Sequence, residues 1–389
     1  MLKLLRKSLQ SELYTFFNEL NSYVKVTASA FVQSRKKLKP DLFYELNHLI
    51  VKEYFTDNDG NVKLYKGMRV LSVDGSTINL PLTGELVERY GTFNNQKKTN
   101  DVVIGRVSVL YDVLNEIVLD GMLRPFSEGE AALCREHFKY ARKGDLIIMD
   151  RAYASFESVW LLRQQQVDFL FRCKEAFSNE VKAFYESGKQ DEVIEIKPSQ
   201  HKSFKGLPYN QHCTLKVRML RIELDSGEVE ILMTSLLDKR KFHHKEFKKL
   251  YFKRWRVETF YDRFKNIIGV ENFSGTSHQF IQQEFNCALY MSNMQTILTQ
   301  DAENEAKEKY QSRKYEYKVN RSLALGFIRE RLIQVYSDKR ETEKILEELK
   351  ELFIVNVIPV RPGRKNPRDV DKYRQRTKPR QFKNRRIVF

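Results

Sequence analysis

Two short apolar runs that each end in an aspartate constrain the fold of this chain more than any other feature. The first, RVLSVD, covers Arg69–Asp74, and the second, DLIIMD, covers Asp145–Asp150. Between them lie two β-rich stretches, Asp101–Tyr111 and Glu116–Met122, and their short DVLN connection predicts an antiparallel hairpin. The pattern therefore predicts buried strands that carry acids at their ends.

Helical segments alternate with these strands. Ser127 is expected to cap a helix that runs through Ala141, with Glu130 as the acid of a capping box. A second helix over Ser155–Gln165 and a short strand over Phe169–Cys173 follow. Three meandering strands, a helix, a strand, a helix and a strand are the order of a ribonuclease-H-like α/β sheet. Residues 75–100 are polar and rich in turn formers, and we expect them to form a loop.

The two aspartates are candidates for a shared site. Asp74 precedes Gly75 and Asp150 precedes Arg151, each where an apolar run stops. Open α/β sheets assemble their sites outside the ends of buried strands. A role in turn formation explains either aspartate alone. Two such strand endings, joined by an acid on a later helix, indicate a site instead.

The later acid lies in YFKRWRVETFYDRFK, a stretch without Gly or Pro that predicts a helix. At about 100° per residue, one narrow stripe holds four of its polar side chains: Tyr251, Arg254, Glu258 and Lys265. The opposite face is apolar and is expected to be buried: Phe252, Val257, Phe260, Phe264 and Ile267. A carboxylate between two cations and a phenol suits the binding of a metal and a phosphate. An ordinary i,i+4 ion pair on a solvated face explains the same stripe, and the nearby Asp262 leaves the choice of carboxylate open.

Carboxylates that converge on one point require divalent cations, because they cannot all be ionised cheaply without them. The chain has no cluster of Cys or His, so oxygen ligands favour Mg²⁺ or Mn²⁺ over zinc. Two such ions would activate water or a 3′-hydroxyl and stabilise the leaving oxygen of a phosphodiester. The cysteines are far apart and are expected to be reduced thiols of a cytosolic protein: Cys134, Cys173, Cys213 and Cys287.

The charge of the chain points to a polyanionic partner. The formal net charge is +17 and the pI is near 9.5, which favours nucleic acid. No apolar run approaches the ~20 residues of a membrane span. The N-terminal MLKLLRKSLQSELYTFF is interrupted by charges, so we expect neither a signal peptide nor a membrane partner.

Three motifs together resemble the DDE transposases of the insertion-sequence 4 family of bacterial cut-and-paste elements. They are SVDGSTINLP, DLIIMDRAYAS and the signature Tyr-x2-Arg-x3-Glu-x6-Lys, which the stretch 251–265 matches without a gap. The similarity runs from about Val70 to Asn293. The resemblance selects Glu258 over Asp262. It implies that Asp74, Asp150 and Glu258 are the catalytic acids and hold two Mg²⁺ ions, with Mn²⁺ as a substitute.

The resemblance also implies the partner and the reaction. Tyr251, Arg254 and Lys265 would hold transposon-end DNA beside the cleaved bond. The enzyme would cut at terminal inverted repeats and join the freed 3′-hydroxyls to target DNA, as a homodimer on paired ends. A hairpin intermediate is expected at each end. The expected location is the bacterial cytoplasm, associated with the nucleoid.

The interval between Asp150 and Glu258 is longer than a strand and a helix require. The surplus, about Lys174–Phe242, contains two strand-like stretches, Cys213–Leu224 and Glu228–Ser235, joined by the turn formers DSG. The family inserts a β-rich subdomain here, and well-studied relatives carry in it a Trp that stacks on a flipped base. The tryptophans of this chain, Trp160 and Trp255, lie outside that interval. The missing Trp counts against a hairpin route unless another ring stacks on the base: Trp255, or an insertion aromatic such as Phe177, Phe204 or Tyr209.

The two ends of the chain are candidates for DNA contacts. TASAFVQSRKKL, capped at Thr27, predicts a helix whose Arg35, Lys36 and Lys37 suit a DNA groove. A helical packing or oligomerisation arm explains it equally well. Beyond a helix at Ser322–Tyr336, the basic, Pro-containing tail Arg361–Phe389 suits a phosphate-binding arm, or else is simply solvated.

The sequence thus predicts a ribonuclease-H-like catalytic core with an inserted β-rich subdomain and helical N- and C-terminal regions. Five segments are expected: a DNA-binding region at 1–66, a first core part at 67–173, the insertion at 174–242, a second core part at 243–295 and a C-terminal region with the tail at 296–389. The predicted function is a transposase, a metal-dependent endonuclease and strand transferase. The alternatives are a domesticated or phage-associated nuclease and an inactive DNA-binding regulator.

Overall fold

The computed structural model describes residues 8–57, 61–93, 102–199, 204, 206–224, 226–337 and 341–361. Within these ranges a nine-stranded sheet has the order β2-β3-β1-β5-β6-β9-β8-β7, with β4 on the outer side of β3. The strands are β1 (Val70–Leu80), β2 (Thr92–Phe93), β3 (Val102–Asp112), β4 (Ile117–Pro125), β5 (Leu146–Met149), β6 (Asp168–Cys173), β7 (Asp191–Ile196), β8 (Leu215–Glu223) and β9 (Val229–Thr234). The predicted hairpin is β3–β4, and β1, β5 and β6 run parallel. This is the expected ribonuclease-H-like α/β core.

The prediction that the first strand ends at Asp74 is wrong. Strand β1 continues to Leu80, which pairs with Val103 of β3. Its parallel pairing with β5 stops at Ser72 and Ile148, however. Asp74 therefore lies in the middle of β1, just beyond the point where β1 stops pairing with β5 and pairs only with β3. Within the polar stretch, residues 75–80 form the rest of β1 and residues 84–90 form helix α4 (Gly84–Tyr90).

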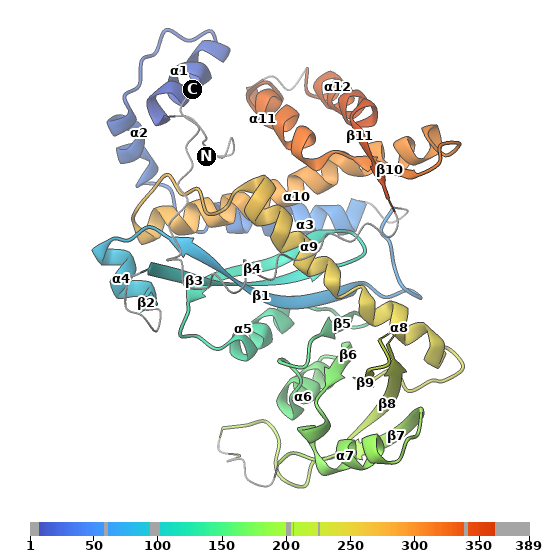
Figure 1. Cartoon of the computed structure of the whole chain (residues 1–389). Helices are drawn as coiled ribbons and strands as arrows, with labels where there is room; N and C mark the ends of the chain where they lie inside the picture. The colour runs from blue at the N-terminus through green and yellow to red at the C-terminus, as the bar shows by residue number, and fades with distance from the viewer. Residues whose placement is uncertain are drawn as a thin grey trace.

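Helices cover both faces of the core (Figure 1). Because successive side chains of a strand point to opposite faces, Val70 and Ile78 of β1 pack in one apolar cluster and Leu71 and Val73 in another. The first cluster contains side chains of α9 (Trp255–Arg263) and of the long helix α10 (His278–Lys309), which α3 (Leu42–Asp57) flanks. The second contains side chains of α5 (Glu130–His137) and α6 (Phe156–Gln164).

The start of α5 differs from its prediction. The helix begins at Glu130, its N-cap is Gly129, and no side chain caps it. Glu130 instead forms an ion pair with Arg106 of β3. The capping box at Ser127 is therefore wrong, because a partner on the neighbouring strand competes for the same carboxylate. The predicted helix that follows is confirmed as α6, and Ser155 caps it by accepting a hydrogen bond from the Ser158 backbone at 3.1 Å.

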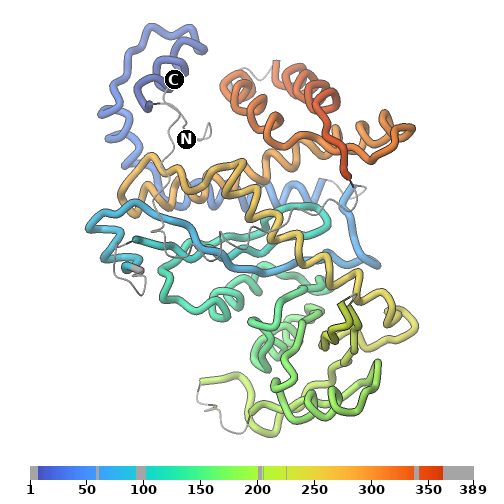
Figure 2. Tube along the Cα trace, in the orientation of Figure 1, coloured from blue at the N-terminus to red at the C-terminus, as the bar shows by residue number. Residues whose placement is uncertain are grey.

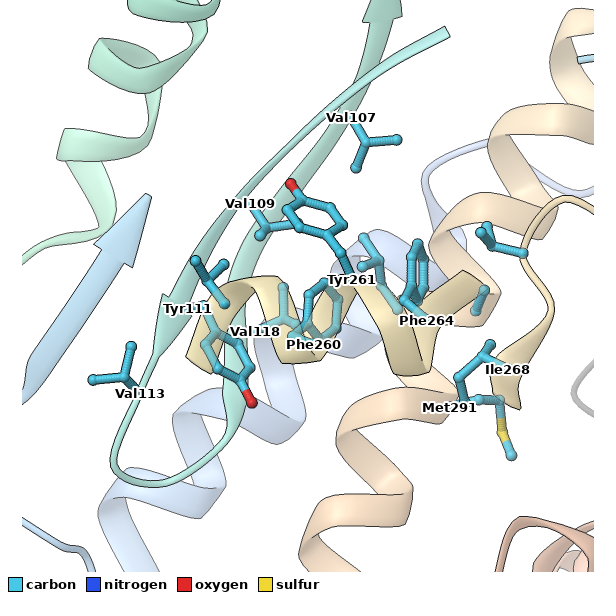
Figure 3. Close-up of a cluster of buried hydrophobic side chains, with 14 of the residues drawn as sticks. Val107, Val109, Tyr111, Val113, Val118, Phe260, Tyr261, Phe264, Ile268 and Met291 are labelled. Atoms are coloured by element: carbon cyan, nitrogen blue, oxygen red, sulfur yellow. The ribbon is translucent and has the colours of Figure 1, made fainter. Parts of the chain in front are cut away.

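The predicted helix 251–265 is divided into α8 (His244–Phe252), α9 and a π-turn (Phe264–Ile268). Hydrogen bonds of i→i+3 spacing join α8 to α9, for example Arg254 N–H to Tyr251 O at 2.9 Å. This tighter turn shifts the angular positions, so Phe252 is 70% exposed instead of buried. The rest of the apolar face is confirmed. Figure 3 shows Phe260, Tyr261 and Phe264 packed along the valines of β3.

The insertion continues the central sheet. Its helix α7 (Asn179–Glu186) follows a short 3₁₀ turn (Glu175–Phe177), and its strands β7–β9 join the core through antiparallel pairing of β9 with β6. The predicted strands at 213–224 and 228–235 are confirmed as β8 and β9. In Figure 1 this part lies at the end of the molecule opposite α1, α2, α11 and α12.

The terminal regions are helical, as predicted. The N-terminal region has α1 (Leu9–Glu19) and α2 (Ala28–Arg35), and Thr27 caps α2. The C-terminal region has α11 (Arg321–Ser337), α12 (Thr342–Val355) and a two-stranded sheet of β10 (Glu316–Val319) and β11 (Val357–Val360). Figure 2 shows both regions on the same side of the central sheet. The tail beyond residue 361 lies outside the described residues, among which no helix is long and apolar enough to cross a membrane.

Candidate active site

The two predicted aspartates lie level with each other at the centre of the sheet. The parallel register pairs Ser72 with Ile148, so Asp74 and Asp150 each lie two residues beyond the last paired position. Asp74 Oδ1 accepts the Gly75 N–H at 2.9 Å. Strand β5 ends at Met149, which leaves Asp150 at its C-terminal end. Neighbouring strands thus bring together two carboxylates that are far apart in the sequence.

The third acid enters from the helix that crosses the sheet. Glu258 lies in the first turn of α9 and accepts a hydrogen bond from Arg254 Nη2 at 3.1 Å. This is the i,i+4 pair that the sequence suggested, but it is not on a solvated face. The Arg254 side chain is only 7% exposed, whereas that of Glu258 is 37% exposed. A buried guanidinium thus meets an accessible carboxylate.

Arg254 links the three acids electrostatically. Burial lowers the pKa of its guanidinium, but the Tyr251 phenol and the Asp150, Glu258 and Asp74 carboxylates together raise this pKa above its ordinary value. Its Nε is buried and has no hydrogen-bond partner within the described ranges. One cation therefore interacts with all three predicted acids and keeps a donor available for an anion.

The electrostatics of Asp74 indicate a shortage of positive charge. Burial raises the pKa of Asp74 to about 6, the Gly75 N–H and Arg254 lower it, and Glu258 and Glu130 raise it again. Glu130 is a fourth carboxylate near the site. The sequence had predicted a different role for it, as the acid of a capping box. A bound cation would relieve this repulsion.

The donor chemistry fits a hard divalent cation, since the predicted ligands are all carboxylate oxygens. Over the part of the chain that the structure describes, no three His, Cys, Asp or Glu side chains already form a group arranged to hold a metal. Arg254 supplies positive charge among the predicted acids. The four cysteines are free, as predicted, and take no part.

The residues predicted to contact DNA fall into two environments. Trp255 is 43% exposed, and the Arg254 guanidinium lies 4.6 Å from its ring centroid. Lys36 and Lys37 are also exposed. Lys265 is half-buried, and its Nζ donates to Ser76 Oγ at 2.7 Å and to the Thr77 carbonyl at 2.8 Å. It therefore ties the π-turn that follows α9 to the part of β1 that follows Asp74.

Arg35 is enclosed and does not share the exposure of its lysine neighbours. It is 4% exposed, stacks 4.2 Å over the Phe280 ring, and pairs with Glu284 at 2.8 Å. It also donates to Gln283 Oε1 at 2.9 Å and to Ser274 Oγ at 3.2 Å. These contacts dock α2 on α10, so Arg35 holds the N-terminal region in place instead of facing DNA.

Two tyrosines near the acids were missed by the sequence analysis. Tyr153 OH lies 3.5 Å from Asp74 Oδ1, and Tyr261 OH donates to the Asp74 carbonyl at 2.7 Å. Tyr153 stands inside the DRAYAS motif, three residues after Asp150, and Tyr261 lies one helical turn after Glu258. The short sequence distance of both tyrosines from predicted acids could have identified them. Burial of Tyr261 on the apolar side of α9 concealed it.

A cavity of about 330 Å³ lies between the loop after Asp150 and the insertion. Its lining combines cations and aromatic rings, including Arg151, Lys174, Lys197, Phe177 and Tyr209. Tyr209 is buried against Phe156, with ring centroids 5.0 Å apart. The cavity has the mixture of charge and aromatic surface that a nucleotide requires.

The order of the strands defines this chain as a ribonuclease-H-like α/β protein. Residues 65–294, more than half of the chain, match the family described as "Transposase DDE domain", and the chain belongs to that family. No curated protein matches it. A solved piggyBac transposase, in a synaptic complex with hairpin DNA, is similar with 11% identity and a TM-score of 0.40. That match covers 79% of this chain and 62% of the piggyBac chain.

Proposed function

We propose that this protein is a cut-and-paste DNA transposase of the insertion-sequence 4 type, with Asp74, Asp150 and Glu258 as its catalytic acids. The proposal is supported by the matching positions of Asp74 and Asp150 beyond the paired strands, and by the electrostatic effect of all three carboxylates on Arg254. Family membership supports the reaction class, a metal-dependent DNA-cutting enzyme. In a bacterium such an enzyme works in the cytoplasm, on nucleoid DNA.

The three acids would hold two Mg²⁺ ions, with Mn²⁺ as a substitute. When bound, such ions supply Lewis-acid activation of the attacking oxygen and stabilise the leaving oxygen. The chain's own residues orient the DNA. Arg254 offers a buried guanidinium, with an Nε that has no partner among the described residues, to a phosphate oxygen beside the acids. Water, and later the freed 3′-hydroxyl, would then be the nucleophiles.

The DNA partners are the terminal inverted repeats and the target. Lys36 and Lys37 are exposed at the end of α2 and suit phosphate contacts at the transposon end. We propose two protomers on paired ends, because both ends must be cut before joining. The net charge of +17 supports a polyanionic partner.

We further propose a hairpin route for the second strand, in which the first 3′-hydroxyl attacks the opposite strand. Extruding a base from the duplex tip costs a few kcal/mol, and stacking it on an aromatic ring returns ~1–3 kcal/mol. Trp255 supports this role because it is exposed beside Arg254. Phe177 is the alternative, in the basic cavity beyond Asp150.

The experiment is cleavage of end-labelled transposon-end DNA, resolved on denaturing gels with and without Mg²⁺. Asp74→Ala, Asp150→Ala and Glu258→Ala should each abolish nicking and retain DNA binding, because acids that share cations act as a unit. Asp262→Ala is the matched control on the same helix and should cut normally. Cleavage by Glu258→Ala but not by Asp262→Ala would refute the assignment.

The same gels distinguish the alternatives. A species of doubled length that renatures by snapping back supports the hairpin, whereas two independent nicks refute it. Nicking without joining to target DNA would indicate a domesticated or phage-associated nuclease. DNA binding without any nicking would indicate an inactive regulator.

A further inference from the structure

Three buried tyrosines connect the elements that carry the acids. Tyr153, in the turn after β5, places its hydroxyl 3.5 Å from Asp74 Oδ1 on β1. Tyr261 of α9 donates to the Asp74 carbonyl at 2.7 Å. Tyr251, at the end of α8, places its hydroxyl 3.4 Å from Asp150 Oδ1. Tyr153 thus joins the turn after β5 to β1, Tyr261 joins α9 to β1, and Tyr251 joins α8 to the end of β5.

Tyr153 and Tyr261 each lie three residues after another predicted acid, Asp150 and Glu258 respectively. The Tyr153 N–H donates to the Asp150 carbonyl at 3.0 Å, so the turn that starts at Asp150 returns to Asp74. Tyr261 lies one helical turn beyond Glu258, so its bond to the Asp74 carbonyl fixes the helix against β1. The position of Asp74 therefore depends on Tyr153, which follows Asp150, and on Tyr261, which follows Glu258.

Because the rings of Tyr153 and Tyr261 are buried, their hydroxyls have few other hydrogen-bond partners. Tyr153 and Tyr261 are 3% and 6% exposed, and a buried phenol normally finds a hydrogen-bond partner. Figure 3 shows the Tyr261 ring lying across Val109 of β3, among the labelled apolar side chains. Tyr153 OH also lies 3.4 Å from where a Cβ on Gly75 would be, so it reaches over the peptide that follows Asp74.

We infer that Tyr153 and Tyr261 are positioning residues that set the spacing of the catalytic carboxylates and hence the affinity for the divalent cation. The inference rests on the proposed function. The phenol–carboxylate contact of Tyr153 is longer than the usual ~2.7–2.8 Å of O–H···O bonds. Such contacts are often loose in the free enzyme and tighten in the complex.

The test removes one hydroxyl at a time through Tyr153→Phe and Tyr261→Phe. Residues that orient metal ligands typically cost about 10–100-fold in metal affinity when changed. We expect each variant to bind Mn²⁺ about tenfold more weakly by electron paramagnetic resonance. The Mg²⁺ concentration for half-maximal nicking should rise in parallel, while the rate at saturating Mg²⁺ stays close to wild type.

Tyr336→Phe is the matched control, since Tyr336 OH lies 3.1 Å from Tyr290 OH in the C-terminal region, away from the acids. Its Mn²⁺ affinity should equal that of wild type. Unchanged Mn²⁺ affinity in Tyr153→Phe, or a loss of thermal stability without a change in metal dependence, would overturn the inference. Absence of Mn²⁺ binding and nicking in wild type would instead refute the proposed function.

Discussion

Asp74 is a carboxylate whose ionised form is disfavoured in the folded protein. Burial raises its pKa to about 6, and Glu258 and Glu130 add to that shift. An unfolded aspartate has a pKa of about 3.9. Because the folded protein binds the proton more tightly, its stability falls as the pH rises from about 4 to about 6, and stays lower above that.

Replacing this charge should therefore stabilise the protein while abolishing cleavage. In the absence of metal, Asp74→Asn should gain on the order of 1–2 kcal/mol above about pH 7, and nothing below about pH 4. Thermal melts in a chelator at both pH values measure the difference. Asp262→Asn is the control, because Asp262 is exposed on the same helix as Glu258. Equal melting of Asp74→Asn and wild type above pH 7 would contradict the expectation.

At the scale of elements, the Arg35 side chain makes the charged and aromatic contacts that dock helix α2 on α10. Arg35 reaches Ser274, Gln283 and Glu284, in the loop and helix that follow the catalytic helix α9. The side-chain amides of Gln279, Gln283 and Asn286 reinforce this docking, for example Gln283 Nε2 to the Leu38 carbonyl at 2.8 Å. Loss of the arginine would leave Glu284 without its cation.

Arg35→Met should release the N-terminal region. Breaking a buried ion pair costs about 3–5 kcal/mol, so α2 should undock while the sheet remains folded. Limited proteolysis near residues 20–40 should accelerate, and preference for the transposon end over unrelated DNA should fall. Lys37→Met is the control, since it should weaken binding to all sequences and leave proteolysis unchanged. Slow proteolysis of Arg35→Met would show that other contacts hold α2.

A second buried hydrogen-bond network joins helices α5 and α3 to strands β3 and β4. His137 Nδ1 of α5 lies 2.7 Å from Asp120 Oδ2 of β4, and its Nε2 lies 2.9 Å from Ser108 Oγ of β3. His48 of α3 lies 3.4 Å from the other oxygen of Asp120. Burial raises the pKa of Asp120, but hydrogen bonds and charge from both histidines hold it below its ordinary value.

His137→Ala should destabilise the fold by about 2–4 kcal/mol, because it leaves a buried carboxylate with one partner fewer. Urea unfolding at neutral pH measures the loss. The contribution of Asp120 is present above its unfolded pKa of about 3.9 and disappears as the pH falls. His212→Ala, at an exposed position, should leave the midpoint unchanged. A similar midpoint for both variants would contradict a structural role.

At the scale of the whole molecule, one continuous sheet joins the core and the insertion. Strand β9 pairs with β6 from Leu170↔Thr234 to Cys173↔Ile231. The buried Arg218 of β8 then binds Asp191 at 2.6 Å and the Phe242 carbonyl at 2.8 Å. The insertion is therefore anchored to the chain segment that leads into α8 and the catalytic helix.

Removing the tail after Arg361 should change the strength of DNA binding but not its specificity. The deleted segment is strongly basic, and phosphate contacts carry no sequence information. The slope of log affinity against log salt should become shallower by about 0.9 for each phosphate that the shortened chain no longer neutralises. Competition between transposon-end and random DNA should be unaffected. An equal loss of end preference would mean that the tail reads sequence.

Local patterns in the sequence predicted most of the elements. The hairpin β3–β4, the short strand before Asp150 and the cap at Thr27 depend on alternation and on hydrogen bonds between near neighbours, which a short stretch of sequence contains. The charge of the chain and the spacing of the family signature are also visible without a structure. These features determined the fold class and the family.

Tertiary structure alone decided where those elements meet. Strand β1 continues past Asp74 because β3 still pairs with it, and Arg35 is buried because α10 supplies its partners. Tyr153 and Tyr261 reach Asp74 from segments that lie far from it in the sequence. These contacts depend on long-range packing and burial, which change hydrogen-bond partners and pKa values in ways that residue spacing does not encode.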